Sequence, residues 1–460
     1  MALPASSGVS ESRDVRSYAL AMAHRERLLN LGPVLDGAEA SSPVEALEAV
    51  TRELGSALGA TYVSFLIADL SGRALVRLAH VPLDAAAAGN TGEALTRGER
   101  HDDEESATVV PFDGGPAERA LRTQTVQVLP DPNPNQATPA AGRWRVLAPV
   151  TERGESIGLL ELHLPKEPGP DTLAEIGRFA HLLAFVVIAN GRHTDLFEWG
   201  QRTRTFSLSA EIQQRLLPGP RTCEAGAFTL AAWLEPAATI GGDTFDYSLA
   251  RDLLHLSVTD AMGHGVVAAL TATLCVGSLR GTRRQGVSLL EQAVNTNAAL
   301  AEHAANTRTD DFVTGLMGRL DLRTGSLELV NAGHVTPYLA RDSHVDPVDL
   351  PVDLPLGLFA DSTYRSTPLT LSPGDRLVIV TDGMLERNAA NTDLPTAIQE
   401  TRSLHPREAV RALADSVLEA TGHALSDDAT VLCLDWHGLH DHDRRTVFGA
   451  DPIRASNALQ

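Results

Sequence analysis

Four aspartates stand at the ends of short apolar runs, and this placement constrains both the fold and the chemistry of the chain. A short apolar run predicts a buried strand, and a carboxylate at its end projects from the packed sheet into solvent. Four carboxylates converging there would repel one another unless cations lay between them. Oxygen ligands of this kind suit Mg²⁺ or Mn²⁺, not zinc. The four residues are Asp243, Asp260, Asp382 and Asp427.

The bulk composition favours a folded protein of several domains that binds neither nucleic acid nor membranes. The chain has 460 residues, 43% hydrophobic and 21% charged, and this length predicts two or three domains. Its formal net charge of −21 repels phosphate backbones and anionic lipid. Three widely spaced cysteines indicate neither a disulfide framework nor a zinc site. The N-terminus shows no secretory signal, and the most apolar stretch, residues 179–189, is too short to span a bilayer, so we expect a cytoplasmic protein.

Changes in composition divide the chain into five segments. We predict an N-terminal lead with a short helix near residues 14–31, a sensor-like domain, a connector helix that docks or dimerises, a larger C-terminal domain with two helices, and a polar tail. A homodimer is therefore one of the two arrangements that such a connector allows. In order, these segments cover residues 1–41, 42–191, 192–218, 219–437 and 438–460.

The second segment resembles a GAF sensor domain in the order of its expected elements. Residues 44–58 have helical spacing, and residues 61–68 and 74–80 predict a first hairpin. Residues 146–164 predict a closing hairpin, and a long helix starts near Asp171. The resemblance implies an α/β sensor domain that takes a small-molecule ligand, whose identity the sequence does not give.

Five motifs follow one another in the C-terminal segment. Any one of them could be an ordinary turn. In this order they resemble the metal-dependent protein serine/threonine phosphatases of the PPM type, in the bacterial SpoIIE/RsbU-like branch. The resemblance implies an α+β protein whose C-terminal domain is an α-β-β-α sandwich with two metal ions at one end of its sheets. The motifs are Gly241-Gly242-Asp243-x-x-Asp246, Asp260-x-x-Gly263-His264-Gly265, Asn331-Ala332-Gly333-His334, Thr381-Asp382-Gly383 and Asp427-Asp428-Ala429-Thr430.

The same resemblance implies roles for individual residues. Asp260 would bridge two Mn²⁺ or Mg²⁺ ions, and the Ala261 carbonyl would add a ligand. Asp243, Asp382 and Asp427 would complete the coordination, directly or through water. Asp428 and Asp246 would support these ligands.

The motifs do not identify the group that donates a proton to the leaving alkoxide. Many relatives place a histidine two residues after the bridging aspartate, where this chain has Met262. His264 is therefore the candidate catalytic acid, with water as the alternative. His264 and His334 could each instead hydrogen-bond a glycine-rich turn.

These expectations lead to two functional hypotheses. The first is a Mn²⁺/Mg²⁺-dependent protein serine/threonine phosphatase, regulated by its GAF-like domain, whose substrate is a phosphorylated anti-sigma-factor antagonist with a STAS domain. The second is a binding or scaffold protein in partner-switching signalling whose phosphatase fold is inactive.

Overall fold

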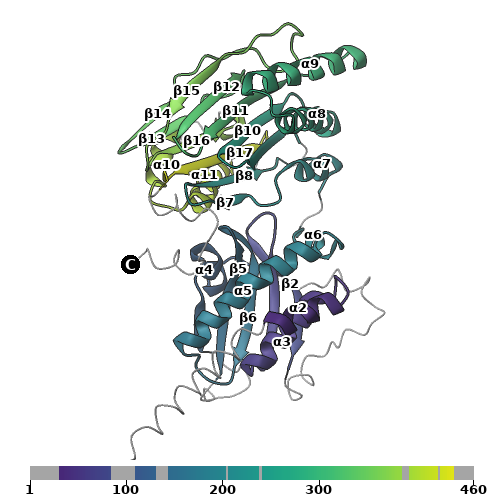
Figure 1. Cartoon of the computed structure of the whole chain (residues 1–460), viewed down its shortest axis with the longest axis vertical. Helices are drawn as coiled ribbons and strands as arrows, with labels where there is room; N and C mark the ends of the chain where they lie inside the picture. Colours follow the sequence, from purple (N-terminus) through teal and green to yellow (C-terminus); the bar gives the residue numbers. More distant parts are fainter. Residues whose placement is uncertain are drawn as a thin grey trace, which may run out of the picture. The chain divides into compact units, whose positions relative to one another are not determined.

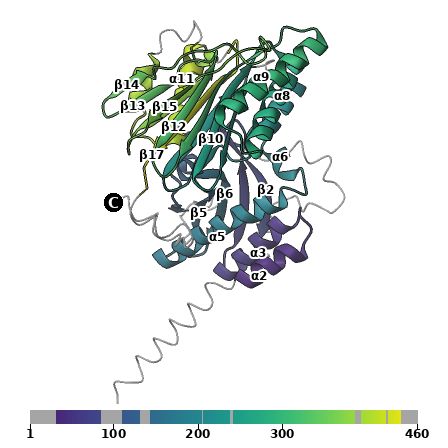
Figure 2. The ribbon, with the colours of Figure 1, turned by 45° about the horizontal axis from the view of Figure 1, so that its top comes forward.

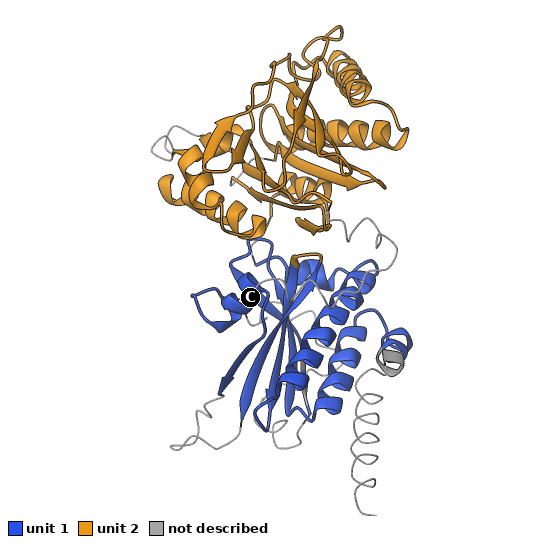
Figure 3. Ribbon diagram, turned by 60° about the vertical axis from the view of Figure 1, so that its left-hand side comes forward, with its two compact units in different colours: residues 1–152, 156–204 blue, residues 153–155, 205–460 orange. Residues whose placement is uncertain are grey.

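The chain forms two compact units (Figure 3), residues 1–152 with 156–204 and residues 153–155 with 205–460. The computed structural model describes residues 31–83, 109–130, 143–203, 206–237, 241–385, 393–422 and 425–439. The helix predicted near residues 14–31 and nearly all of the predicted tail lie outside these ranges. The first described helix, α2, is Leu31–Ala40.

The first unit is a six-stranded sheet in the order β3-β2-β1-β6-β5-β4 with helices on both faces (Figure 1). The predicted hairpins and the long closing helix are confirmed, the latter as α5 with Pro170 in its first turn. The elements are α3 (Ala46–Leu58), β1 (Tyr62–Ala68), β2 (Ala74–Pro82), β3 (Val109–Pro111), α4 (Pro116–Thr123), β4 (Gln127–Pro130), β5 (Trp144–Glu152), β6 (Glu155–Leu164), α5 (Pro170–Asn190) and α6 (Leu196–Gly200).

The two faces of this sheet differ. One face carries Val63, Phe65 and Leu162, which pack against the buried sides of α3 and α5. The other face packs Leu66 and Leu159 against α4. This arrangement follows from the period-2 alternation of side chains along β1 and β6.

The second unit contains two antiparallel sheets, ordered β15-β12-β11-β10-β9 and β14-β13-β16-β17-β8-β7. Its described helices number more than the two expected from the sequence. The elements are α7 (Leu208–Leu216), β7 (Thr222–Glu224), β8 (Phe228–Glu235), β9 (Asp243–Leu249), β10 (Leu253–Ala261), α8 (Gly265–Arg284), α9 (Leu289–Thr307), β11 (Val313–Asp321), β12 (Ser326–Ala332), β13 (Tyr338–Arg341), β14 (His344–Pro347), β15 (Ser366–Thr370), β16 (Arg376–Val380), η2 (Asp382–Leu385), α10 (Leu394–Glu400), α11 (Pro406–Ala420) and β17 (Ala429–Trp436).

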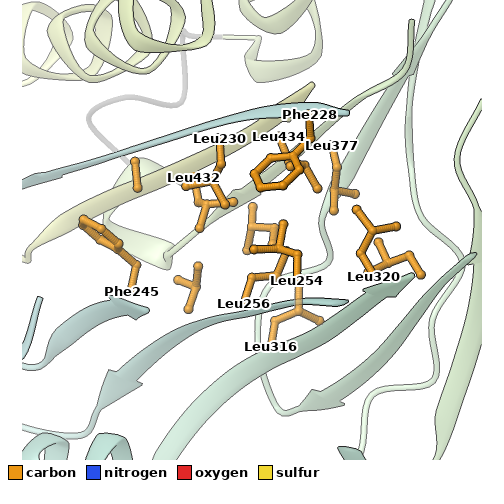
Figure 4. Close-up of a cluster of buried hydrophobic side chains, with 14 of the residues drawn as sticks. Phe228, Leu230, Phe245, Leu254, Leu256, Leu316, Leu320, Leu377, Leu432 and Leu434 are labelled. Atoms are coloured by element: carbon orange, nitrogen blue, oxygen red, sulfur yellow. The ribbon is translucent and has the colours of Figure 1, made fainter. Parts of the chain in front are cut away.

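The two sheets face each other across a core of leucine and phenylalanine side chains. Phe228 and Leu432 from one sheet meet Leu256 and Leu316 from the other (Figure 4). Burying such side chains contributes about 25 cal/mol for each Å² of apolar surface removed from water. This core fixes the two sheets in register and so fixes which strand ends come together.

Helices cover both outer faces of the sandwich. The pair α8 and α9 lies over the five-stranded sheet in both views (Figures 1 and 2), with Cys275 and Ala293 packed on Met317. On the far side, Ile398 and Leu413 pack on the six-stranded sheet. The predicted α-β-β-α sandwich is therefore confirmed.

The connector is not the single helix expected over residues 192–218. In the described residues it holds two short helices, α6 and α7. The second starts afresh because the Ser207 side chain accepts a hydrogen bond from the Ala210 amide and caps it. By packing, α7 belongs to the second unit, although the predicted boundary at residue 219 left it in the connector.

Within the described residues, two helices are long and apolar enough to cross a membrane, α5 and α8, with mean hydropathies of 1.6 and 1.3. The apolar run of α5 is thus longer than the stretch singled out from the sequence. One side of each helix is buried in the core of its own unit. Core helices of folded domains commonly have this composition.

Candidate metal centre

Asp243 and Asp260 lie opposite each other on neighbouring strands. Asp243 is the first residue of β9, Asp260 is the penultimate residue of β10, and the two are register partners. Partners in an antiparallel pair carry their side chains on the same face, with Cβ atoms about 5 Å apart. The Asp243 side chain is buried. Two carboxylates are therefore forced together by strand pairing alone.

The other sheet contributes at the same edge through β16 and β17. These strands are antiparallel, so the end of β16 and the start of β17 meet, with Val380 opposite Val431. Asp382 stands two positions after the end of β16, and Asp427 two positions before the start of β17. Asp382 and Asp427 lie near enough to Asp260 for their charges to act on its carboxylate.

Two threonine hydroxyls connect this edge to Asp243. Thr381 Oγ1 and Thr430 Oγ1 donate to Asp243 Oδ2 at 2.7 and 2.6 Å. The Thr430 amide in turn donates to Thr381 Oγ1 at 3.0 Å. One carboxylate oxygen of Asp243 is thereby held by the second sheet, which fixes the orientation of the whole side chain.

Asp428 is held by a buried network that includes α7. Gln213 Nε2 donates to Asp428 Oδ2 at 2.6 Å and to the Asp243 carbonyl at 2.8 Å. The Ala237 amide donates to Asp428 Oδ1 at 2.8 Å. Gln213 and Asp428 are both inaccessible to solvent. Sequence reasoning missed Gln213, because a single glutamine in a polar helix gives no signal of its partner.

Two glycines allow the backbone to approach this edge closely. A Cβ on Gly242 would lie 2.5 Å from the Ala261 carbonyl oxygen and 3.3 Å from Asp260 Oδ1. A Cβ on Gly383 would lie 2.0 Å from the Asp428 carbonyl oxygen. Both positions need glycine because no side chain fits there, so the motif glycines create the space around the carboxylates.

The carboxylates raise one another's pKa values. Burial, followed by the charges of Asp260 and Asp428, raises the pKa of Asp243 well above its ordinary value. Burial and three neighbouring charges raise the pKa of Asp260 to about 7. These neighbours are Asp382, Asp427 and Asp428. Negative charge concentrated in this way is stabilised by bound cations.

The donor set fits magnesium or manganese. Carboxylate oxygens and the Ala261 carbonyl are hard ligands, which these ions prefer. Among the described residues, no three acidic, histidine or cysteine side chains are close enough to hold one ion together. The assignment of Asp243, Asp260, Ala261, Asp382 and Asp427 as ligands therefore stays a prediction.

Asp246 does not support the ligands as expected. Its two carboxylate oxygens pair with Arg280 and Arg283 of α8, each at 2.8 Å. The reason is strand periodicity, because an offset of three residues from Asp243 places Asp246 on the opposite face of β9. Asp246 therefore ties the helix layer to the sheet.

His264 lies at the N-cap of α8, where it is exposed and its side chain makes no capping hydrogen bond. Met262, two residues after Asp260, is 39% exposed. The role of His264 as catalytic acid therefore stays a prediction.

His334 is a buried residue with a defined place beside the site. Its Nδ1 lies 3.1 Å from Thr314 Oγ1, and Thr314 is the register partner of Asp260. Burial lowers the pKa of His334 to about 4, against a backbone hydrogen bond with Val380 that raises it. A neutral imidazole thus packs between the two sheets, next to the strand ends that carry Asp260 and Asp382.

Two helix-covered antiparallel sheets with aspartates at one edge agree with the phosphatase fold that the motifs implied. Residues 250–437 match the family model of the stage II sporulation protein E (SpoIIE), and residues 42–187 match that of the GAF domain. The chain therefore combines a SpoIIE-family, PP2C-type phosphatase domain with an N-terminal GAF domain, as the sequence motifs predicted.

Known relatives of the chain include two phosphoserine phosphatases of Bacillus subtilis (strain 168). RsbU is 24% identical over 233 residues, which are 49% of this chain and 68% of RsbU. RsbP is 22% identical over 243 residues, which are 50% of this chain and 58% of RsbP. Among solved structures, RsbX in complex with magnesium is 17% identical, with a TM-score of 0.38 over 47% of this chain and 98% of RsbX.

Proposed function

We propose that this chain is a Mn²⁺- or Mg²⁺-dependent protein serine/threonine phosphatase that hydrolyses a phosphoserine or phosphothreonine on a signalling protein. The observation that carries the proposal is the pairing of Asp243 with Asp260 beside the strand ends that bear Asp382 and Asp427. The distant likeness to RsbU and RsbP, both phosphoserine phosphatases, supports it.

The chain's own residues position and charge the site. Thr381 and Thr430 hold Asp243, and Gly242 lets the backbone pass close to the Ala261 carbonyl and the Asp260 carboxylate. Divalent ions bound there supply Lewis-acid activation of water and neutralise charge on the phosphoryl group. The described cysteines, Cys223, Cys275 and Cys433, are buried, so none is presented as a nucleophile.

The direct test uses the full chain with p-nitrophenyl phosphate and a phosphoserine protein. We expect hydrolysis with Mn²⁺, none with EDTA, and at least a hundredfold loss in Asp260→Asn. Asp252→Asn, at the exposed turn before β10, is the matched control and should keep full activity. Activity that survives both EDTA and Asp260→Ala would reject the mechanism.

For the substrate, we propose a phosphorylated anti-sigma-factor antagonist with a STAS domain, in a partner-switching circuit in the cytoplasm. The support is the likeness to the phosphoserine phosphatases RsbU and RsbP. A phosphoproteome comparison with Asp382→Ala tests it: the substrate's phosphoserine should accumulate. If no STAS-domain protein changes, this substrate class is wrong.

The inactive scaffold predicted as the alternative differs in metal binding. Calorimetric titration of the apoprotein with Mn²⁺ separates the two, because a phosphatase should bind two ions and a scaffold none.

Regulation by the GAF domain is tested by deleting residues 1–190. If rate, metal affinity and oligomeric state are unchanged, the GAF domain does not regulate the enzyme.

A further inference from the structure

The sheet of the first unit has a polar area on the face opposite α3 and α5. Strand pairing places Ser64 opposite Glu161 and Tyr62 opposite His163. These residues alternate with Val63 and Leu162, which belong to the core on the other face. The area thus continues the face that packs against α4, but with charged and hydroxyl side chains in place of leucines.

Two arginines converge on the single carboxylate of this area. Arg77 Nη1 donates to Glu161 Oε2 at 2.8 Å and to Ser64 Oγ at 2.6 Å, and it also contacts the Tyr62 hydroxyl. Arg145 Nε donates to Glu161 Oε1 at 2.5 Å. Glu161 is buried. Burial would raise its pKa, but the hydrogen bond with His163 and the two arginines lower the pKa to about 2.

Counting the described residues alone, the charges in this cluster do not cancel. Two guanidinium groups face one carboxylate, which leaves one positive charge in a protein whose formal net charge is −21. Partial burial of an excess charge is costly unless a counter-ion pairs with it. The local sign is thus opposite to that of the chain as a whole.

Both arginines also retain donors. A guanidinium group has five N–H donors. Within the described part of the structure, Arg77 donates hydrogen bonds through Nη1 alone and Arg145 through Nε alone. Their side chains are 21% and 36% exposed, so a solute can reach them. The guanidinium nitrogens that make no hydrogen bond with a described residue form forks, which match carboxylate and phosphoryl oxygens in pairs.

We propose that Arg77 and Arg145, oriented by Glu161, form an anion site in the GAF domain that binds the carboxylate or phosphoryl group of a small molecule. Glu161 acts as the positioning residue: it occupies one edge of each guanidinium and leaves the others for the ligand. The Tyr62 ring, whose centroid lies 5.8 Å from Arg77 Cζ, borders the same place.

The test measures binding to the full chain in EDTA, so that the candidate metal centre holds no ion. The probes are benzoate, which carries a carboxylate, and phenylphosphonate, which carries a phosphoryl group that cannot be hydrolysed as an ester. Benzamide is the neutral control of the same shape. We expect calorimetry to show at least one anion binding about tenfold more tightly than benzamide. The stronger of the two anions assigns the ligand class.

Variants locate the site. Arg145→Gln should weaken binding of the preferred anion about tenfold. Arg178→Gln removes the same charge from the exposed side of α5, which covers the other face of the sheet, and should change nothing. Glu161→Gln keeps the shape of the side chain and one acceptor oxygen for the arginines but removes the competing negative charge, so it should instead tighten binding. A purely structural role for the cluster predicts loss in both Arg145→Gln and Glu161→Gln.

Circular dichroism checks that each variant folds, and Arg145→Lys, which keeps the charge but not the fork, replaces Arg145→Gln if that variant does not fold. Arg145→Lys should bind the preferred anion more weakly than the wild type does, but more tightly than the wild type binds benzamide. Equal binding of both anions and benzamide, or unchanged anion binding in the Arg145 variant, would overturn the proposal. Neither result bears on the phosphatase assay, which concerns the other unit.

Discussion

The hydroxyl of Thr381 donates a hydrogen bond of 2.7 Å to Asp243 Oδ2, although the two residues are 138 positions apart in the chain. This bond joins the end of β16 in one sheet to the start of β9 in the other. The orientation of a candidate metal ligand therefore depends on correct packing of both sheets.

Thr381→Val should weaken metal binding. It removes the donor to Asp243 and leaves the buried Thr430 amide without its acceptor. Residues that orient metal ligands typically change affinity or activity 10- to 100-fold, so we expect about that loss in Mn²⁺ affinity, measured by calorimetry. Thr370→Val, on the exposed side of β15, is the control. Equal Mn²⁺ affinity in wild type and Thr381→Val would refute this role.

Gly383→Ala should destabilise the second unit. The new Cβ would lie 2.0 Å from the Asp428 carbonyl oxygen, so the backbone must move. Overpacking of this kind costs about 1–3 kcal/mol, which thermal unfolding should detect as a lower Tm together with lost activity. Gly277→Ala, in α8 with nothing within 4 Å of its Cβ, should be neutral or stabilising. A Tm of Gly383→Ala at or above that of the wild type would contradict the close approach.

Asp260 should make the metal-free protein less stable as pH rises. Its pKa is raised to about 7 in the folded state, against about 3.9 in an unfolded chain. The unfolded chain then binds fewer protons, so stability falls from about pH 4 to pH 7. In EDTA, Tm should fall by several degrees over this range.

Asp260→Asn should flatten this pH dependence, while Asp252→Asn should leave it as in the wild type. Added Mn²⁺ should raise the wild-type Tm most at neutral pH, where the carboxylates are ionised. If Tm changes with pH in the same way in the wild type and in Asp260→Asn, the pKa of Asp260 is not raised by its neighbours.

Glu161 should have the opposite effect in the first unit. Its pKa is lowered to about 2, so the stability it contributes is present above its unfolded pKa of about 4.3 and lost as pH falls towards 2. The difference in unfolding free energy between wild type and Glu161→Gln, from urea titrations, should shrink by about 3 kcal/mol between pH 5 and pH 2. Glu167→Gln, an exposed change of the same charge, should show no such trend.

The sequence predicted the features that depend on local pattern. Apolar runs ending in aspartate gave β10 and β16, and the glycine-rich turns marked where the chain passes Asp260 and enters α8. The GAF hairpins and α5 followed from alternation and helical spacing in the same way. Short strands such as β13, with four residues, have too few positions to show a period.

The features that the sequence did not predict depend on contacts between distant segments. Asp246 lies within a motif that suggested a supporting role, but its face of β9 is the one that meets α8. Gln213 and Asp428 are 215 residues apart, and only the packing of α7 brings them together. The same holds for Arg77 and Glu161, which lie on strands separated by β1 in the sheet.

The position of Gln213 has a practical consequence for anyone expressing the phosphatase half alone. A fragment cut at residue 219, where composition places the boundary, would begin after α7 and leave the Asp428 carboxylate and the Asp243 carbonyl without their shared amide donor. A fragment that starts ahead of Ser207, the cap of α7, keeps that donor. Low activity in the shorter piece would therefore report a missing helix and not a weak enzyme.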